Sequence, residues 1–412
     1  MASVARRNLF EDLPRFLVAQ AGIVFAVSLV TIQNGILNGF TRSTTVLIDR
    51  SQVDVWVSAQ EMVNLQLTLP IPAALVNEVA NIEGVERTEP LITRSTLWRS
   101  STGQISPIQM FGFDPNSQLF RIGPLSAGTL NDLNQPYTLI PDKANLDSLR
   151  VQRVGDTGTV NSLPARIVGL TQDTQSIASG TFVFTSTANA NAFLTSGFTS
   201  STNCQVLPQG GLDCRTITER TPQAPPQAPR PLRASDTITY VLVKAKPGQD
   251  VQALKQRIEA TLPGIRAFTR QEMAQRNRNY WVQRTGIGFI LGLGATVGVV
   301  VGMVVVGQIL YSSVADHLKE FGTLKAMGAS DWLIYRIILE QAVWMGIIGF
   351  IPSLGLCLAL GAWTYATQGI TILITPLTAT GVLALTLGMC VGSALFAIQK
   401  VMHVDPAIVF KA

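Results

Sequence analysis

The sequence predicts an α-helical membrane protein with four transmembrane helices and a large α+β domain between the first two of them. The 412-residue chain is 47% hydrophobic and only 14% charged, whereas soluble domains carry about 25% charged residues. Its mean hydropathy is +0.30. The low charge content comes from a few long runs that contain no Asp, Glu, Lys or Arg. These runs reach the roughly 20 residues that a helix needs to cross a bilayer.

The four predicted spans are built on these runs. The last uncharged stretch is too long for one span and is divided at 363–376. Gly369 and Pro376 break a helix there, and Trp363 and Tyr365 suit a membrane interface. The predicted spans are 16–41, 285–312, 333–362 and 377–399.

Basic residues beside the spans predict the orientation, because cytoplasmic loops carry an excess of Lys and Arg. They precede the first span, lie between the second and third, and follow the fourth, whereas the loop at 363–376 is uncharged. Both termini and the segment 313–332 are therefore expected in the cytoplasm. The segment 42–284 is expected in the periplasm of a bacterium, and the whole chain in its inner plasma membrane. The basic residues are Arg6, Arg7, Arg15, His317, Lys319, Lys325, Arg336, Lys400, His403 and Lys411.

The two ends of the chain are assigned to the cytoplasmic side. Residues 1–15 are expected to form an amphipathic elbow at the membrane surface, since apolar and charged side chains alternate along them. A disordered basic tail is the alternative. The first apolar run is longer than the core of a signal peptide, which favours an uncleaved anchor. Residues 400–412 are expected to be a cytoplasmic tail.

The segment 42–284 shows a similar pattern near both of its ends. Alternating strands at 53–58 and 85–93 flank a helix at 73–82. Later, strands at 237–245 and 265–269 flank a helix at 251–262. Two such βαβ-like halves predict a split ferredoxin-like core. The insert between them is predicted to be mostly β, because short strands alternate with Gly, Pro, Asn and Asp.

A stretch rich in Ser, Thr, Gln and Pro at 195–233 predicts an exposed flexible loop. This loop either has no specific role or docks a partner. Cys204 and Cys214 lie within it and would close a short loop as a disulfide, adding about 3 kcal/mol in an oxidising periplasm. Cys357 and Cys390 fall in predicted spans and are expected to be small apolar packing residues. No metal site is expected, because the loop supplies no His and no further Cys.

Glycines recur in the second span. Gly294, Gly298 and Gly302 are four residues apart and share one helical face. Small residues at this spacing let two helix backbones approach closely. We therefore expect a helix–helix contact here, with local flexibility as the alternative.

Catalytic motifs are missing from the sequence. No phosphate-binding GxxxxGK[ST] loop occurs, and the only histidines are His317 and His403. No Ser/His/Asp set, carboxylate pair or metal-ligand spacing can be assembled. Glu340 is an acidic residue near the start of the third span, close to the interface. The chain is therefore not expected to be an enzyme.

The most informative stretch is EFGTLKAMGAS, residues 320–330. At helical spacing Phe321, Leu324 and Met327 form an apolar stripe that can enter a groove on a partner. Glu320 and Lys325 supply charges at its rim. A linker that lies on the membrane is the alternative interpretation.

This stretch resembles the signature of the FtsX-like, MacB-type ABC permeases. The opening of the third span, with Glu340 at its acidic position, and the ending HVDPAIVFKA are also similar to that family. The N-terminal span and MFGFDPNSQLF (110–120) look most like its DevC branch, found in cyanobacteria. The signature positions are filled by Glu320, Gly322, Leu324, Lys325, Ala326, Met327, Gly328 and Ala329.

The resemblance implies a permease subunit without ATPase activity of its own. Two copies would pair, and the coupling helix at 313–332 of each would dock on an ABC ATPase subunit that binds ATP and Mg²⁺. Motion would pass to the periplasmic domain. A periplasmic adaptor of the membrane-fusion type and an outer-membrane TolC-like channel would receive a lipid-like or other amphiphilic substrate. FtsX relatives imply an alternative, a non-transporting regulator that activates a periplasmic partner.

Overall fold

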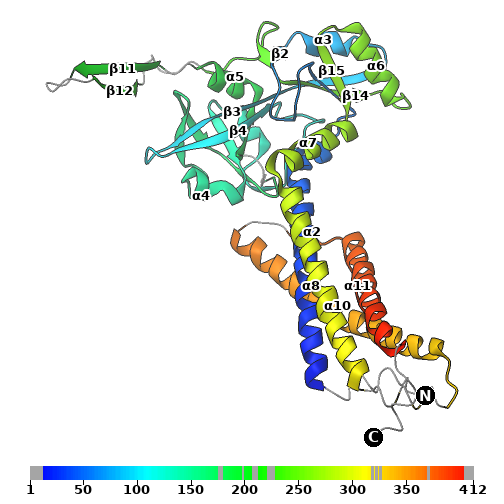
Figure 1. Cartoon of the computed structure of the whole chain (residues 1–412). Coiled ribbons are helices and arrows are strands. Elements are labelled where there is room, and N and C mark those ends of the chain that lie inside the picture. The colour runs from blue at the N-terminus through cyan, green and yellow to red at the C-terminus, as the bar shows by residue number, and fades with distance from the viewer. Residues whose placement is uncertain are drawn as a thin grey trace. The chain divides into compact units, whose positions relative to one another are not determined.

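The computed structural model describes residues 13–402, with gaps at 175–179, 197–198, 207–211, 220–227, 317–319, 321–322, 324–326 and 369–371 (Figure 1). Two compact units make up the chain: residues 1–40 with 285–412, and residues 41–284. Most of the predicted N-terminal elbow and most of the C-terminal tail lie outside the described residues.

Four long apolar helices confirm the predicted number of spans. They are α2 (Leu13–Arg50), α8 (Ile287–Asp316), α10 (Asp331–Gln368) and α11 (Pro376–Met402). Each contains a stretch long and apolar enough to cross a membrane. The helix α2 continues nine residues beyond the predicted boundary at 41. Its last turns carry Val46, Leu47 and Ile48, which are buried in the core of the second unit.

The first unit has a core shared by its four helices. Ile23 of α2, Leu310 of α8, Ile338 of α10 and Ala394 of α11 are all buried in it. The turn before α11 is capped by Thr375, whose hydroxyl accepts from the Thr378 amide at 3.2 Å. This cap fixes where the fourth span begins.

The second unit contains the predicted ferredoxin-like core. Its antiparallel strands lie in the order β15-β1-β14-β3, the order expected for two interleaved βαβ halves. One sheet face packs on the two helices, whose buried residues include Val79, Leu254 and Ile258. The elements are β1 (Val55–Ala59), α3 (Leu75–Ala80), β3 (Val85–Ser100), β14 (Tyr240–Ala245), α6 (Val251–Thr261) and β15 (Ile265–Thr269).

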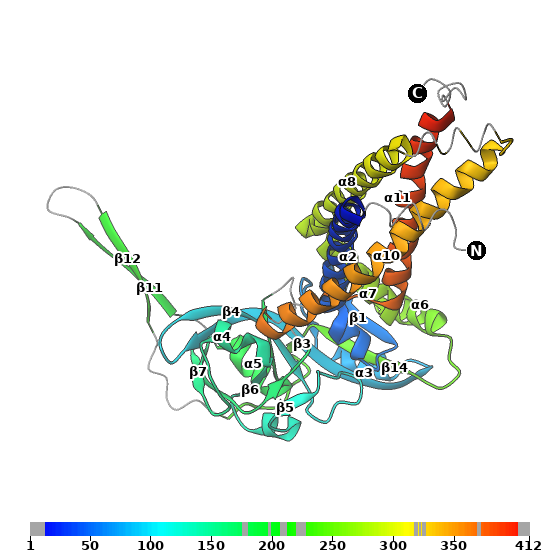
Figure 2. The same cartoon turned by 90° about the horizontal axis from the view of Figure 1, so that it is seen from below.

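The insert is mostly β, as predicted. The long strand β3 leaves the ferredoxin-like sheet and pairs with β4 over eight residue pairs, and Figure 2 shows the two side by side. The sheet continues β4-β10-β6-β8-β7, and β7 pairs back onto β3. Six strands thus close into a ring. The added strands are β4 (Ile105–Phe113), β6 (Thr138–Pro141), β7 (Thr157–Val160), β8 (Leu163–Ile167) and β10 (Thr181–Ser186).

Shorter elements complete the insert. The helix α5 (Thr187–Thr195) was not predicted; its N-terminus is capped by Ser186, which accepts from the Asn189 amide. The remaining elements are β2 (Ile71–Pro72), β5 (Leu125–Ala127), α4 (Leu146–Leu149), β9 (Leu170–Thr171) and β13 (Thr237–Ile238), with 3₁₀ turns at Leu130–Asn134 and Lys143–Asn145.

The stretch 195–233 differs from the predicted loop. It contains an antiparallel hairpin of β11 (Thr199–Val206) and β12 (Leu212–Glu219). Its Ser and Thr content suggested a loop, but β-branched Thr and Ile also favour strands. Cys204 and Cys214 are directly opposite each other in this hairpin.

Candidate coupling site

Part of the predicted coupling stretch is described. The helix α8 continues to Asp316, and the structure then describes Glu320, Thr323 and residues 327–330. Phe321, Gly322, Leu324, Lys325 and Ala326 lie outside the described residues. Glu320 is exposed. The amide of Met327 donates to the Thr323 carbonyl oxygen at 2.9 Å, a hydrogen bond with the i to i−4 spacing of a turn.

Gly328 ends this turn in a left-handed conformation, with φ of +91°. A Cβ atom at this position would meet no other atom within 4 Å. Glycine is therefore required here by the backbone and not by a lack of space. Left-handed glycines commonly end helices, which gives a physical reason for glycine at this position of the signature.

Apolar side chains beside this turn face solvent in the single chain. Met327 is 72% exposed, Trp332 71% and Leu333 43%. Three large apolar residues within seven positions are typical of a contact surface. Met327 belongs to the predicted apolar stripe, whereas Trp332, the second residue of α10, was not predicted.

Glu340 lies in the third turn of α10 and is half-buried. Its neighbours Ile338 and Ala342 belong to the core of the first unit. The acidic residue thus follows the exposed apolar surface by two turns.

The three predicted packing glycines of α8 lie close to α2. A Cβ atom at Gly294 would collide with the Gln33 side chain, and one at Gly298 would lie 3.2 Å from Val30. Gly302 lies against Met389 of α11, and a Cβ atom there would also be 3.0 Å from Ala26.

A second line of small residues, which the sequence analysis missed, joins α10 to α2. Gly349 lies against Ile23. The Ser353 hydroxyl donates to the Gly349 carbonyl within α10 at 2.6 Å and to the Val24 carbonyl of α2 at 3.4 Å, and the Cys357 Sγ donates to the Ser28 carbonyl of α2 at 3.6 Å. Their spacing of four residues was visible in the sequence as a small-xxx-small pattern.

In the second unit, the polar helix α7 (Arg270–Thr285) packs on the end of α2 through one buried amide. Asn277 is 2% exposed. Its Nδ2 donates to the Thr44 carbonyl oxygen, and its Oδ1 accepts from the Leu65 amide at 3.1 Å. This helix was not predicted, because its charges and amides show no apolar periodicity.

Comparison with known proteins places these features in a family. The model of the MacB-like periplasmic core domain matches residues 16–261, and that of the FtsX-like permease C-terminal domain matches residues 292–406. The chain is an FtsX-like permease with a MacB-like periplasmic core domain. It therefore belongs to the ABC transporter permeases, which are membrane subunits of transporters.

Three solved structures of isolated domains are similar to parts of this permease. The periplasmic region of MacB from Actinobacillus actinomycetemcomitans is 10% identical, with 56% of the permease and 94% of that chain covered and a TM-score of 0.34. The extracellular domain of the transporter YknZ from Gram-positive bacteria is 8% identical (53% and 99% covered, TM-score 0.33). A domain of a permease protein from Porphyromonas gingivalis is 11% identical (53% and 90% covered, TM-score 0.31). No curated protein sequence matches the permease.

Membership of this family implies an ABC ATPase partner. Within the residues that the structure describes, no group of three or more His, Cys, Asp or Glu is placed to hold a metal ion. The described part of the coupling stretch has the features of a docking surface: a capped helical turn followed by exposed apolar side chains.

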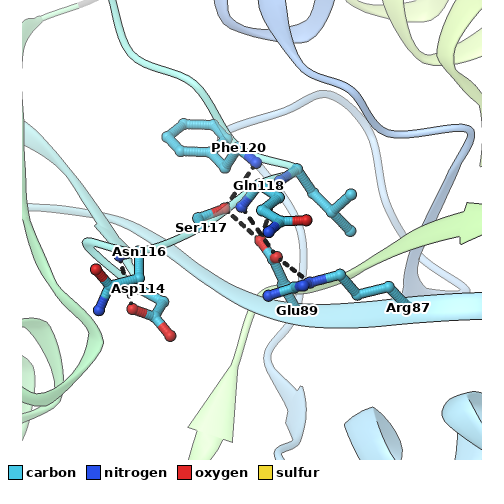
Figure 3. Close-up of polar contacts among 8 residues, drawn as sticks. Arg87, Glu89, Asp114, Asn116, Ser117, Gln118 and Phe120 are labelled. Carbon is cyan, nitrogen blue, oxygen red and sulfur yellow. Dashed lines mark hydrogen bonds and ion pairs between the residues drawn. The ribbon is translucent and has the colours of Figure 1, made fainter.

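The permease's periplasmic domain also contains a buried carboxylate, Glu89 on β3, which holds the turn at 114–120 (Figure 3). Its oxygens accept from Arg87 Nε at 2.7 Å, from the Gln118 amide at 3.1 Å and from the Ser117 hydroxyl. The Leu119 amide donates to it at 3.3 Å. The turn is the second half of MFGFDPNSQLF, so this carboxylate fixes a stretch that the sequence analysis singled out.

Proposed function

We propose that this permease is the membrane subunit of an ABC exporter. Its coupling segment docks on an ATPase subunit, which binds ATP and Mg²⁺. Motion then passes into the periplasmic domain and drives export of a lipid-like or other amphiphilic substrate. Two permease copies and two ATPase subunits form the inner-membrane complex.

The observation that carries the proposal is the exposed apolar surface at the coupling segment. Met327 and Trp332 flank the Gly328 turn and leave most of their apolar area uncovered. An apolar surface of this kind is stabilised by insertion into a groove on a partner. The FtsX-like C-terminal model spans this surface.

The remaining parts of the proposal follow from the family resemblance. A periplasmic adaptor and an outer-membrane TolC-like channel receive the substrate. The resemblance to the DevC branch favours a lipid-like cargo. Export is favoured over the regulatory alternative because that resemblance extends to the N-terminal span and the turn at 114–120.

The proposal is tested with the permease co-expressed with its ATPase subunit. Trp332→Ala and Met327→Asp are expected to reduce ATPase co-purification and permease-stimulated ATP hydrolysis at least tenfold, because each removes apolar contact area. Trp363→Ala is the matched control, since Trp363 is 63% exposed at the other end of the same helix. Equal effects of Trp332→Ala and Trp363→Ala would exclude docking through this surface.

A second measurement separates the two functions. An exporter is expected to co-purify with an adaptor from the periplasmic side. Co-purification with a periplasmic hydrolase, and with no adaptor, would instead identify a regulator.

A further inference from the structure

A large groove lies in the periplasmic domain between α6, β15 and α7, with a volume of about 1120 Å³. We call it the α7 groove. One wall is a row of amide side chains spaced four residues apart along α7. The row consists of Gln271, Gln275, Asn279 and Gln283. Binding pockets for small molecules have volumes of about 300–1,000 Å³, so the α7 groove can hold a headgroup together with part of an acyl chain.

The charges of the α7 groove favour an anion. Four cationic and two acidic side chains line it, which leaves a net charge of +2. They are Lys255, Arg266, Arg276 and Arg278, with Glu259 and Glu272.

Both carboxylates of the groove are already engaged. Glu272 accepts from Lys255 Nζ at 2.8 Å, and Glu259 accepts from the Ala267 amide at 2.9 Å. Among the described residues, Arg266 and Arg278 have no carboxylate partner. Arg guanidinium groups bind carboxylates and phosphates through paired hydrogen bonds.

The groove has an apolar lip formed by the loop that follows β1. Val63 lines the groove, and Val63, Leu67 and Leu69 are 39%, 53% and 55% exposed. Val63 lines the groove together with its cationic side chains, and the exposed Leu67 and Leu69 follow in the same loop. Apolar and cationic surfaces of this kind match the two ends of an amphiphile.

This lip is held rigidly. Arg276 donates to the carbonyl oxygens of Met62 and Val63 at 2.8 and 3.1 Å, and its guanidinium lies 5.4 Å from the centre of the Phe268 ring. The hydroxyl of buried Tyr240 donates to the Leu65 carbonyl at 3.0 Å. These polar contacts hold the backbone of the loop in place. Because the loop is already ordered, less conformational entropy is lost when a ligand binds to its apolar side chains.

The helix that lines the groove leads along the chain into a membrane span. Gln283 precedes Ile287, the first residue of α8, by four positions.

We infer that the α7 groove binds an amphiphile with an anionic headgroup, a phosphate or a carboxylate. Arg266 and Arg278 hold the anion, the amide row binds neighbouring polar groups of the headgroup, and Val63, Leu67 and Leu69 contact the start of the chain. The interpretation of the groove as a substrate site rests on the proposed function. The binding of the amphiphile does not require the ATPase.

The test is native mass spectrometry of the full-length permease in a non-ionic detergent, with phosphatidylglycerol and zwitterionic phosphatidylcholine as probes. Phosphatidylglycerol is expected to bind about tenfold more tightly than phosphatidylcholine, and Arg266→Gln/Arg278→Gln to remove this preference. An anionic fatty acid added in a separate arm distinguishes a carboxylate from a phosphate requirement.

The matched control is Arg94→Gln/Arg99→Gln, which removes the same charge from exposed positions on β3. It is expected to retain the preference. Equal loss in both double variants, or equal binding of the two lipids, would overturn the inference. A change in the dimer fraction without a change in lipid binding would identify the groove as an interface between copies and would also overturn it. None of these results depends on ATP hydrolysis, so failure here leaves the docking test unaffected.

Discussion

The side-chain amide of Asn277 on α7 donates a hydrogen bond to the backbone carbonyl of Thr44 on α2. The same side chain accepts from the Leu65 amide. One buried amide therefore joins three segments that are distant in the sequence: the end of the first long helix, the loop that follows β1, and the helix that leads to α8.

Replacement of this amide is expected to loosen the junction. Asn277→Leu leaves the Leu65 amide unsatisfied and should lower the free energy of unfolding by about 1–3 kcal/mol. Hydrogen exchange in the full-length protein is expected to increase at residues 44–48 and 64–67. Asn279→Leu, an exposed neighbour on the same helix, is the control. Equal exchange in both variants would contradict a joining role for Asn277.

The turn at 114–120 is expected to depend on Glu89. Glu89→Gln removes a charged acceptor of four hydrogen bonds and should cost about 1–3 kcal/mol. Faster amide exchange at Gln118 and Leu119 is the expected signal. Glu86→Gln, at an exposed position on the same strand, should leave it unchanged. If the two variants behaved alike, the turn would not be held by this carboxylate.

The contact between α10 and α2 is expected to be sensitive to added volume. A Cβ atom at Gly349 would lie 2.5 Å from Ile23 Cγ2, so Gly349→Ala should force the helices apart at a cost of about 1–3 kcal/mol. Gly355→Ala is the control, because it is the same substitution in the same helix and a Cβ atom there meets nothing within 4 Å. Thermal unfolding in detergent should show a lower midpoint for Gly349→Ala alone. Equal midpoints would show that this contact adapts to a methyl group.

The Asp236 carboxylate is expected to make the local stability of the segment 230–236 depend on pH. Hydrogen bonds from the Arg230 guanidinium and the Arg233 amide lower the pKa of Asp236 from 3.8 to about 2. Because its pKa is lowered on folding, the carboxylate stabilises the segment 230–236 above about pH 4, and this effect is lost as the pH falls towards 2. Pepsin cleavage in this segment should be slow at pH 4 and faster at pH 2.

The matched variant for that experiment is Asp236→Asn, which should be cleaved faster than the wild type at pH 4 and at the same rate as the wild type at pH 2. Glu61→Gln removes an exposed carboxylate elsewhere and should behave as the wild type. Slow cleavage of Asp236→Asn at both pH values would rule out this ion pair as the cause.

The hairpin β11–β12 predicts a disulfide. Directly opposed residues of antiparallel strands have Cα atoms about 4.5–5.5 Å apart, within the range of disulfides, and Cys204 and Cys214 are such a pair. Peptide mass spectrometry of protein from an oxidising periplasm should show the two linked. Alkylation of both thiols before reduction would refute the bond, and the buried Cys357 and Cys390 serve as internal free-thiol controls.

The elements with strong local patterns were predictable from the sequence. Uncharged runs identified four spans, and the repeated strand–helix–strand pattern identified the ferredoxin-like core. The helix α7 could not be predicted, because its stability comes from tertiary contacts of Met273, Ala274 and Asn277 rather than from an apolar stripe.

The candidate site was predictable only in part. The coupling signature pointed to Met327 and Gly328, but neither the left-handed turn at Gly328 nor the exposure of Trp332 has a sequence pattern of its own. The α7 groove depends on residues from the loop after β1, α6, β15 and α7, which lie up to about two hundred positions apart in the sequence. Only the folded chain brings Val63 to Arg276.

The ring of strands in the insert has a consequence for partner binding. Because β7 pairs back onto β3, the ring of described strands β3, β4, β10, β6, β8 and β7 is closed. A closed sheet has no unpaired backbone edge to which an incoming peptide strand can be added. Where these strands are paired on both sides, a partner that contacts the ring would recognise side chains, and its specificity could change by surface substitution without any change in the strand framework.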